Sequence, residues 1–175
     1  SIVCDEAQGI FNTAQALANR GHKSILYLYD SLTHSGQQKL IGFRHAIKQL
    51  SLSEDKRLIR QIPRTLAATS YEIEQLLKEG VHFDAVITSE DLLAVAAQRT
   101  ILTHGLSMPV IGCNNSVLAE CATPTLTSLD NRLDLMCQQA VSVCVKIIKG
   151  ADSPIPSEYR FPAVLFERDS FKFQA

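Results

Sequence analysis

Residues 84–115 constrain the fold most, because they contain two short apolar segments separated by one segment of helical length. The first, DAVIT at 84–88, and the second, VIG at 110–112, contain the β-branched residues that are typical of buried strands. Between them a helix is predicted to begin at Leu92 and to end at Gly105, since glycine suits the left-handed turn that follows a helix. Two parallel strands joined by one helix form a βαβ unit.

A polar cluster follows each of these two strands, SED at 89–91 and CNN at 113–115. Asp91 is the predicted N-cap of the helix, because an aspartate side chain can accept hydrogen bonds from the first free backbone N–H groups. A right-handed crossover places the carboxyl ends of both strands at the same sheet edge, where open α/β sheets bind ligands. We therefore expect Glu90 and Asn114 to face one cleft.

The same alternation of strand and helix patterns runs through the rest of the chain. Further strands are predicted at 2–4, 24–28, 58–62, 125–129 and 161–166, and further helices at 10–18, 36–50, 67–78 and 132–149. This order predicts an α/β domain with a parallel sheet covered by helices on both faces. The helix at 132–149 is apolar on more than one side, so we expect most of its surface to be buried.

The composition narrows the class of protein. With 175 residues, of which 46% are hydrophobic, the chain is large enough for one sizeable domain or two small lobes. A formal net charge of −1 gives it no basic footprint for nucleic-acid binding. Since no apolar run approaches the ~18 residues of a membrane helix and no signal-peptide pattern begins the chain, we expect a cytoplasmic protein without membrane contact.

The residues that carry chemistry form no catalytic pattern. Five cysteines without a C-x-x-C pair or a Cys/His ligand spacing predict reduced, packed side chains and no metal site, with Cys137 and Cys144 on one helix face. The five histidines are scattered, and no G-x-S-x-G, G-x-G-x-x-G or Walker-type loop is present. We therefore predict no catalytic residues, no cofactor and no enzyme activity.

Five segments carry a resemblance to a known family: ANRGHKSILYL at 18–28, SGQQKLIGFRHAI at 35–47, DAVITSEDLLAVAA at 84–97, PVIGCNN at 109–115 and PTLTSLD at 124–130. In this order and spacing they resemble the effector-binding domain of the lactose-repressor (LacI/GalR) family of bacterial transcription regulators. The resemblance implies the periplasmic-binding-protein type I fold. That fold has two Rossmann-like α/β lobes, three crossings between them and an effector in the cleft.

The resemblance also implies a division of the chain. Residues 1–22 would be the last strand and helix of the first lobe, 23–123 the second lobe, 124–156 a crossing with a helix that returns to the first lobe, and 157–175 the final strand of the second lobe. Members of the family carry a DNA-binding helix-turn-helix module and most of the first lobe ahead of these segments. We therefore expect those parts outside this chain, and we expect the missing lobe to cover the helix at 132–149.

By resemblance, seven residues would contact the effector: Lys39, Glu90, Asn114, Ser35, Thr65, Asn131 and Asp5. Three of them depart from the family, with Lys39 in place of arginine, Glu90 in place of asparagine and Asn114 in place of aspartate. Lysine keeps the positive charge but loses the two-pronged guanidinium that grips a diol or a carboxylate. Purely structural roles are the alternatives: an exposed helix charge for Lys39, a turn residue for Asn114, and a turn or cap residue for Asn131 and Asp5.

The predicted function is effector binding and dimerisation in a ligand-responsive transcription regulator, such as a repressor. Its partners would be a sugar-like or other small polar metabolite, a second copy of the chain, and operator DNA through the module that is absent here. A zwitterionic or amine-bearing effector is one consequence of Glu90. By resemblance, the dimer surface would consist of Leu92, Leu93, Ala96, Arg99, Val117, Leu118 and Cys121.

Two other functions use the same kind of fold. A solute-binding protein of a transport system would be secreted and monomeric, and an upstream signal peptide would identify it. A sugar- or nucleotide-modifying enzyme on a Rossmann-like sheet would need a phosphate-binding loop, which the sequence lacks. The unpaired cysteines favour the cytoplasmic regulator.

Overall fold

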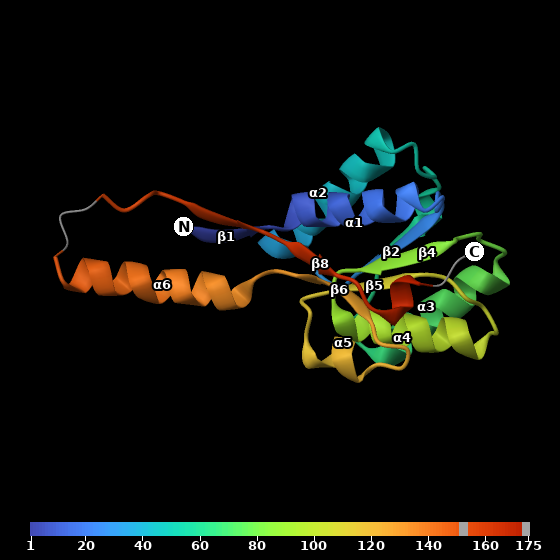
Figure 1. Cartoon of the computed structure of the whole chain (residues 1–175). Coiled ribbons are helices and arrows are strands. Elements are labelled where there is room, and N and C mark those ends of the chain that lie inside the picture. Colours follow the sequence, from blue (N-terminus) through green and yellow to red (C-terminus); the bar gives the residue numbers. More distant parts are fainter. Residues whose placement is uncertain (151–153, 173–175) are drawn as a thin grey trace.

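The computed structural model describes residues 1–150 and 154–172, which form a six-stranded sheet with flanking helices and an extension that projects from it (Figure 1). The helices are α1 (Glu6–Asn19), α2 (His34–Gln49), α3 (Leu66–Lys78), α4 (Asp91–Thr103), α5 (Val117–Cys121) and α6 (Leu133–Ile148). The strands are β1 (Ile2–Asp5), β2 (Ile25–Tyr29), β3 (Ile59–Gln61), β4 (Ala85–Thr88), β5 (Val110–Cys113), β6 (Thr127–Asp130), β7 (Tyr159–Pro162) and β8 (Val164–Phe166).

The large sheet has the strand order β3-β2-β4-β5-β6-β8, in which the first five strands are parallel and β8 is antiparallel to β6. The register pairs Tyr27 with Ile87 and Ile87 with Ile111. The parallel strands therefore end at one common edge, and the loops after β2, β4, β5 and β6 meet there. The predicted α/β class is confirmed, and β4, α4 and β5 form the βαβ unit that the sequence predicted.

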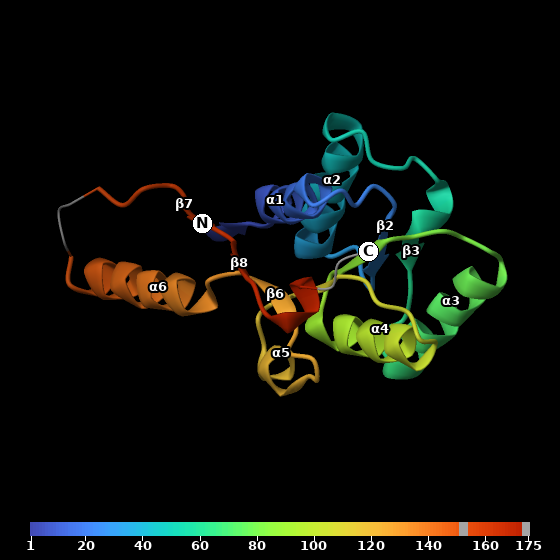
Figure 2. The ribbon, with the colours of Figure 1, turned by 45° about the vertical axis from the view of Figure 1, so that its right-hand side comes forward.

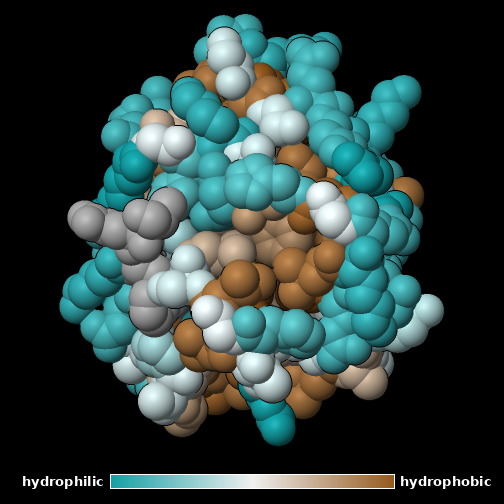
Figure 3. Space-filling model, turned by 90° about the vertical axis from the view of Figure 1, so that its right-hand side faces the viewer, coloured by the Kyte–Doolittle hydropathy of each residue, from teal (hydrophilic) through white to brown (hydrophobic). Residues whose placement is uncertain are grey.

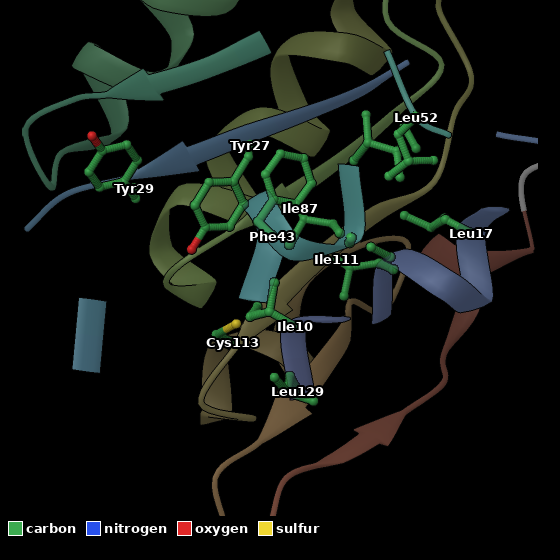
Figure 4. Packing of buried hydrophobic residues seen from close by; sticks show 14 of the residues in the cluster. Ile10, Leu17, Tyr27, Tyr29, Phe43, Leu52, Ile87, Ile111, Cys113 and Leu129 are labelled. Carbon is green, nitrogen blue, oxygen red and sulfur yellow. The ribbon is translucent and has the colours of Figure 1, made fainter. Parts of the chain in front are cut away.

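Helices cover both faces of this sheet, α1 and α2 on one side and α3 and α4 on the other (Figure 2). A hydrophobic core lies on each face of the sheet, and successive side chains of β2 point into one core and then the other. Tyr27 packs under α1 and α2 in the first core, whereas Leu26 and Leu28 pack under α3 and α4 in the second. Tyr27 stacks on Phe43 of α2 with ring centroids 4.6 Å apart (Figure 4). Tyr29 also stacks against Tyr27, so three aromatic rings meet in the first core.

The extension consists of β1, β7 and α6 and lies to one side of the sheet (Figure 1). Strand β1 pairs with β7 in parallel, and α6 contacts β1. Within the described chain, α6 buries none of its residues, and Ile148 is 83% exposed. The expected burial of this helix is therefore absent, because a two-stranded ribbon covers too little of its surface.

The cysteine expectation is correct in part. All five cysteines are free, and Cys113 is buried in the first core. Cys121, Cys137 and Cys144 are exposed, so the prediction that the cysteines are packed is wrong for these three. Two of them lie on α6 and share the exposure of that helix.

Two segments differ from the expected division into lobes. Helix α1 was expected with β1 in the first lobe, but Ile10, Ala14 and Leu17 are fully buried between α1 and the large sheet. The final strand, expected as one element at 161–166, is two: β7 joins the extension and β8 joins the large sheet. Helix α1 packs on the large sheet because its apolar side is buried there, and β1 and β7 offer no comparable surface.

Two residues of the expected dimer surface lie in the interior. Leu93 is fully buried and Ala96 is 2% exposed. Leu93 belongs to the core under α3 and α4. Neither can take part in a surface contact, so their assignment to the dimer surface is wrong. Leu93 lies on the sheet-facing side of α4, whereas Ala96 is covered where α4 packs against α3.

The end of the molecule opposite the extension is hydrophilic around a small apolar area (Figure 3). In the part of the chain that the structure describes, no helix has both the length and the hydropathy needed to cross a bilayer.

A close contact between α1 and α2 gives a direct test of the first core. A Cβ atom at Gly42 would lie 2.1 Å from the carbonyl oxygen of Ala7. We predict that Gly42→Ala lowers the free energy of unfolding by about 1–3 kcal/mol, because the two helix backbones must separate. Lys48→Ala on the exposed side of α2 is the control, and urea denaturation is the measurement. An unchanged midpoint for Gly42→Ala would contradict this packing.

Candidate functional site

A cavity of about 630 Å³ lies where the carboxyl edge of the large sheet meets the extension. Its wall is formed by β1, the first turns of α1, α2 and α6, the loops after β5 and β6, and β7. Four of the seven predicted effector residues line it: Asp5, Ser35, Asn114 and Asn131. The cavity is therefore built from both parts of the molecule.

Lys39 lies beneath this wall and is 2% exposed, so its interpretation as an exposed helix charge is wrong. Its Nζ donates a hydrogen bond to the backbone oxygen of Ser89 at 3.0 Å and lies 3.6 Å from Oε1 of Glu6. Burial alone would lower the pKa of Lys39. The carboxylates of Glu6 and Glu90 outweigh burial and raise that pKa, so the amine stays charged.

Glu6 contacts several other residues of the site, although it was not among the predicted site residues. Its Oε1 accepts hydrogen bonds from Ser35 Oγ at 2.5 Å and from Asn131 Nδ2 at 3.4 Å, in addition to its ion pair with Lys39. Its position in the sequence could have indicated it, because Glu6 follows Asp5 directly at the end of β1. Only Asp5 was assigned to the cleft, since it matches the strand end.

Two amide side chains connect Glu6 to Glu90. Asn131 Nδ2 also donates to Asn114 Oδ1 at 2.9 Å, and Asn114 Nδ2 donates to Glu90 Oε2. Glu90 and Asn114 are thus in direct contact across the edge of the sheet. Asn114 has a φ of 95°, a left-handed conformation that asparagine tolerates better than most residues.

Arg64 and Asp30 extend the contacts of Glu90 on the far side. Arg64 Nε and Nη2 both lie 2.6 Å from Asp30 Oδ2, and Nη2 lies 3.6 Å from Glu90 Oε1. Burial raises the pKa of Asp30, but hydrogen bonds from Arg64 and Ser89 lower it further than burial raises it. Burial is also the largest influence on Glu90 and raises its pKa, although Lys39 and Arg64 oppose this. Neither Asp30 nor Arg64 was predicted.

We call the following residues the cleft cluster: Glu6, Asp30, Ser35, Lys39, Arg64, Glu90, Asn114 and Asn131. They come from separate segments of the chain, and the carboxyl edge of the sheet brings them together. Asp30 follows β2 as Glu90 follows β4, so the strand-end rule that found Glu90 applied to Asp30 as well. Arg64 carries no such signal, because it follows Pro63 in a loop.

Two predicted residues have mainly structural roles. Thr65 is exposed and caps α3 by accepting a hydrogen bond from the Ala68 N–H at 3.1 Å, and it makes no hydrogen bond to the cleft cluster in the described chain. Asp5 caps α1 by accepting from the Gln8 N–H at 3.1 Å while it also lines the cavity.

Asp91 is not the N-cap of α4, and this prediction is wrong: Glu90 takes that position, and Asp91 lies in the first turn. The Asp91 carboxylate accepts hydrogen bonds from the N–H of Ser116 at 2.6 Å and from Ser128 Oγ at 2.6 Å. A buried aspartate gains more from these groups than from capping its own helix. A Cβ atom at Gly112 would lie 2.2 Å from Asp91 Oδ1, so glycine is required there.

The two thiols near the site are not activated for reaction. Burial raises the pKa of Cys113 to about 12, so its thiol stays protonated and unreactive. Burial, together with Glu6 and Asp5, raises the pKa of Cys4 to about 11. Across residues 1–150 and 154–172, no group of three or more His, Cys, Asp or Glu side chains is arranged to hold a metal ion.

Comparisons with known proteins agree with this geometry. Residues 14–171 match the model of the periplasmic binding protein-like domain. An HTH-type transcriptional regulator from Lachnoclostridium phytofermentans is 38% identical over 156 residues, which are 87% of this chain and 47% of that protein. The regulator AscG from Escherichia coli is 29% identical over 175 residues, 97% of this chain and 52% of AscG. The chain thus spans about half the length of these relatives.

Solved structures show the same similarity. A sugar-binding transcriptional regulator of the LacI family from Escherichia coli, complexed with phosphate, aligns with a TM-score of 0.89 at 28% identity, over 98% of this chain and 63% of that chain. The transcriptional regulator CelR in complex with cellobiose aligns with a TM-score of 0.84 at 25% identity, over 97% of this chain and 53% of that chain.

The buried ion pair predicts the effect of two substitutions. Lys39→Met should lower the free energy of unfolding by about 3–5 kcal/mol, because Glu6 loses its cation in a buried site. Adding Glu6→Gln should recover more than half of that loss, since no uncompensated charge remains. Urea denaturation of both variants tests the pair. If the double variant is no more stable than Lys39→Met, the two residues do not act as a pair.

The raised pKa of Lys39 also predicts a pH dependence. A raised lysine pKa stabilises the folded state fully below its ordinary value of about 10.4, and this contribution disappears as the pH rises through the raised pKa. The stability difference between the wild type and Lys39→Met should therefore be constant from about pH 7 to 9 and should shrink above about pH 10.5. A difference that shrinks below pH 9 would contradict the raised pKa.

Proposed function

We propose that this chain is the effector-binding and dimerisation part of a cytoplasmic, ligand-responsive regulator rather than an enzyme. The proposal starts from the family, because the chain belongs to the periplasmic binding protein-like domain family, within the lactose-repressor (LacI/GalR) group of transcriptional regulators. The observation that carries this proposal is the cleft cluster between the sheet and the extension. DNA binding is assigned to a segment outside this chain, since the chain spans only about half of its regulator relatives.

The effector would act by fixing the extension relative to the large sheet. Glu6 and Asn131 lie at two of the three places where the chain passes between these parts, after β1 and after β6. Ser35 and Asn114, which also line the cavity, belong to α2 and to the loop after β5. A ligand bound to both groups favours one orientation of the extension, and this preference shifts the protein between states that differ in DNA affinity.

The exposed surface of α6 supports the proposed first lobe. Apolar side chains with at least 41% exposure gather on this helix: Leu133, Val141, Val145, Ile147 and Ile148. Exposed apolar surface of this kind marks an interaction site. In the proposal, residues ahead of this chain extend the β1–β7 ribbon into a sheet that covers α6.

The dimer surface is proposed on α4 and α5, without Leu93 and Ala96. Val117 is 69% exposed and Leu118 is 39% exposed. A groove of about 500 Å³ runs between α4 and α5 and is lined by Arg99 and Cys121. Leu92, at the start of α4, completes the proposed surface.

Substitutions in α5 test this surface. We predict that the double substitution Val117→Glu and Leu118→Glu weakens dimerisation at least tenfold, because four charges would be buried in the symmetric contact. Leu32→Glu, at a residue that is 50% exposed and far from α5 in the sequence, is the matched control. Sedimentation equilibrium of the protein in its full encoded length measures the effect. Dimerisation equal to the wild type would place the interface elsewhere.

A DNA-binding assay tests the function itself. The protein in its full encoded length should bind DNA from the region upstream of its own gene. A small polar metabolite should change that affinity at least fivefold, as allosteric coupling free energies typically do. Fluorescence anisotropy with a panel of sugars and sugar derivatives is the measurement. Specific DNA binding that no metabolite alters, or no DNA binding at all, would overturn the proposal.

A further inference from the structure

Most side-chain donors of the cleft cluster that lie at or behind the cavity wall already bond to other parts of the protein. The Ser35 hydroxyl donates to Glu6. The Asn131 amide nitrogen donates to Glu6 and Asn114, and the Asn114 amide nitrogen donates to Glu90. The buried ammonium group of Lys39 is turned toward Ser89 and Glu6 and is 2% exposed. These donors are therefore committed to the protein itself.

Acceptors, in contrast, remain. Asn131 is 8% exposed and lines the cavity, and its Oδ1 has no hydrogen-bond partner among the described residues. Exchanging its amide atoms would place an oxygen against the oxygens of Glu6 and Asn114, so the orientation of the amide is fixed by its neighbours. The Glu90 oxygen that faces Arg64 is 3.6 Å from the nearest guanidinium nitrogen, which is beyond hydrogen-bond distance. Asn131 and Glu90 thus each keep an oxygen that no donor of the described chain satisfies.

The charged side chains around the cavity are mostly acidic. Asp5, Glu6 and Glu158 line the cavity, and Arg160 is the cation among its lining residues, with His34 as the titratable side chain at the rim. Arg160 already pairs with Glu158 at 2.8 Å and with Asp5 at 3.9 Å.

The cations behind the wall are neutralised as well. Lys39 is paired with Glu6, and Arg64 is paired with Asp30 and approaches Glu90. Carboxylates therefore outnumber cations in and around the cavity, and each cation named here already has an acidic partner. An anionic ligand would meet uncompensated negative charge, whereas a cation would be attracted.

From these hydrogen bonds and charges we infer that the cleft takes a small polyhydroxylated molecule that carries a protonated amine. Glu6, which lines the cavity, and Glu90, which lies behind the lining residue Asn114 and accepts its hydrogen bond, select for the amine through their negative charge. The inference rests on the proposed function, because it names the effector class of the same cleft. An ammonium group supplies donors for these unpaired oxygens and a positive charge for the excess of carboxylates. Hydroxyl groups fit the remaining acceptors and the neutral Gln38 at the rim.

The test compares matched sugars on the protein in its full encoded length. D-glucosamine and D-galactosamine are titrated beside D-glucose and D-galactose, which lack the amine, and beside the N-acetylated forms, which lack the charge. Isothermal titration calorimetry should show at least tenfold tighter binding of an amine than of its neutral counterparts, as a charge-assisted hydrogen bond provides.

Glu90→Gln keeps the shape of the side chain and its ability to accept from Asn114 but removes the charge. This variant should lose at least tenfold in amine affinity and should bind the neutral sugars as the wild type does. Glu79→Gln, an exposed carboxylate at the end of α3, is the matched control and should change neither. The comparison of sugars on the wild-type protein needs no variant, so a failure of Glu90→Gln to fold leaves the test intact.

The outcomes separate this inference from the proposed function. Tighter binding of an amine that depends on Glu90 supports the inference. Equal or tighter binding of the neutral sugars overturns it while leaving a sugar-responsive regulator in place. Binding of none of these sugars also overturns it. In that case the DNA-binding assay with the wider metabolite panel decides the proposed function independently.

Discussion

The buried contact between Lys39 and Glu6 is the interaction on which the cleft depends. It joins the second turn of α2 to the first residue of α1, immediately after the strand that leads out of the extension. An isolated charge in either position would be costly, because the side chain of Lys39 is 3% exposed and that of Glu6 only 12%. Together they hold the ends of two helices and the loop after β4 in one arrangement. The amides of Asn131 and Asn114 then carry the same network to Glu90.

The sheet explains why such a network forms at all. Five parallel strands in close register deliver their following loops to one edge, and helices on both faces bury everything else. Polar side chains in these loops therefore meet one another even though they lie as far apart in sequence as Glu6 and Asn131. The extension closes the open side of this edge with β1, β7 and the start of α6. A cavity between two parts that the chain joins at separate points is suited to a ligand that controls their relative orientation.

Much of the fold was predictable because periodicity and glycine positions are local signals. The βαβ unit at 84–112 and the parallel sheet follow from apolar runs of strand length, and helix ends follow from glycines with positive φ such as Gly105. The placement of α1 was not predictable in this way, since its apolar stripe fits either lobe until the approach of α2 at Gly42 is known. The five-residue helix α5 is too short to produce a periodic pattern. The single strand predicted at 161–166 divides because its two halves pair with different sheets.

The site was predictable only where a strand-end rule or a family position applied. Glu90 and Asn114 were found in this way. The same rule applied to Asp30 and, next to Asp5, to Glu6, but neither was chosen, whereas Arg64 became visible only through its contacts. Lys39 shows the limit most clearly, because its sequence neighbours suggest an exposed helix face and its burial arises from residues about 50 positions away. Leu93 and Ala96 illustrate the reverse error, in which a surface role was given to core residues. Pairings between distant side chains are set by tertiary packing, and a single sequence contains no direct record of them.

Hydrogen–deuterium exchange on the protein in its full encoded length tests the central claim most directly, with and without a metabolite that alters its DNA affinity. If the cleft cluster is the effector site, the ligand should slow amide exchange in the segments at 5–9, 34–39, 89–91, 113–116 and 130–133, which lie far apart in sequence and meet only at this edge. Protection confined to α4 and α5, or the absence of protection in these segments, would contradict the claim that the effector binds between the sheet and the extension.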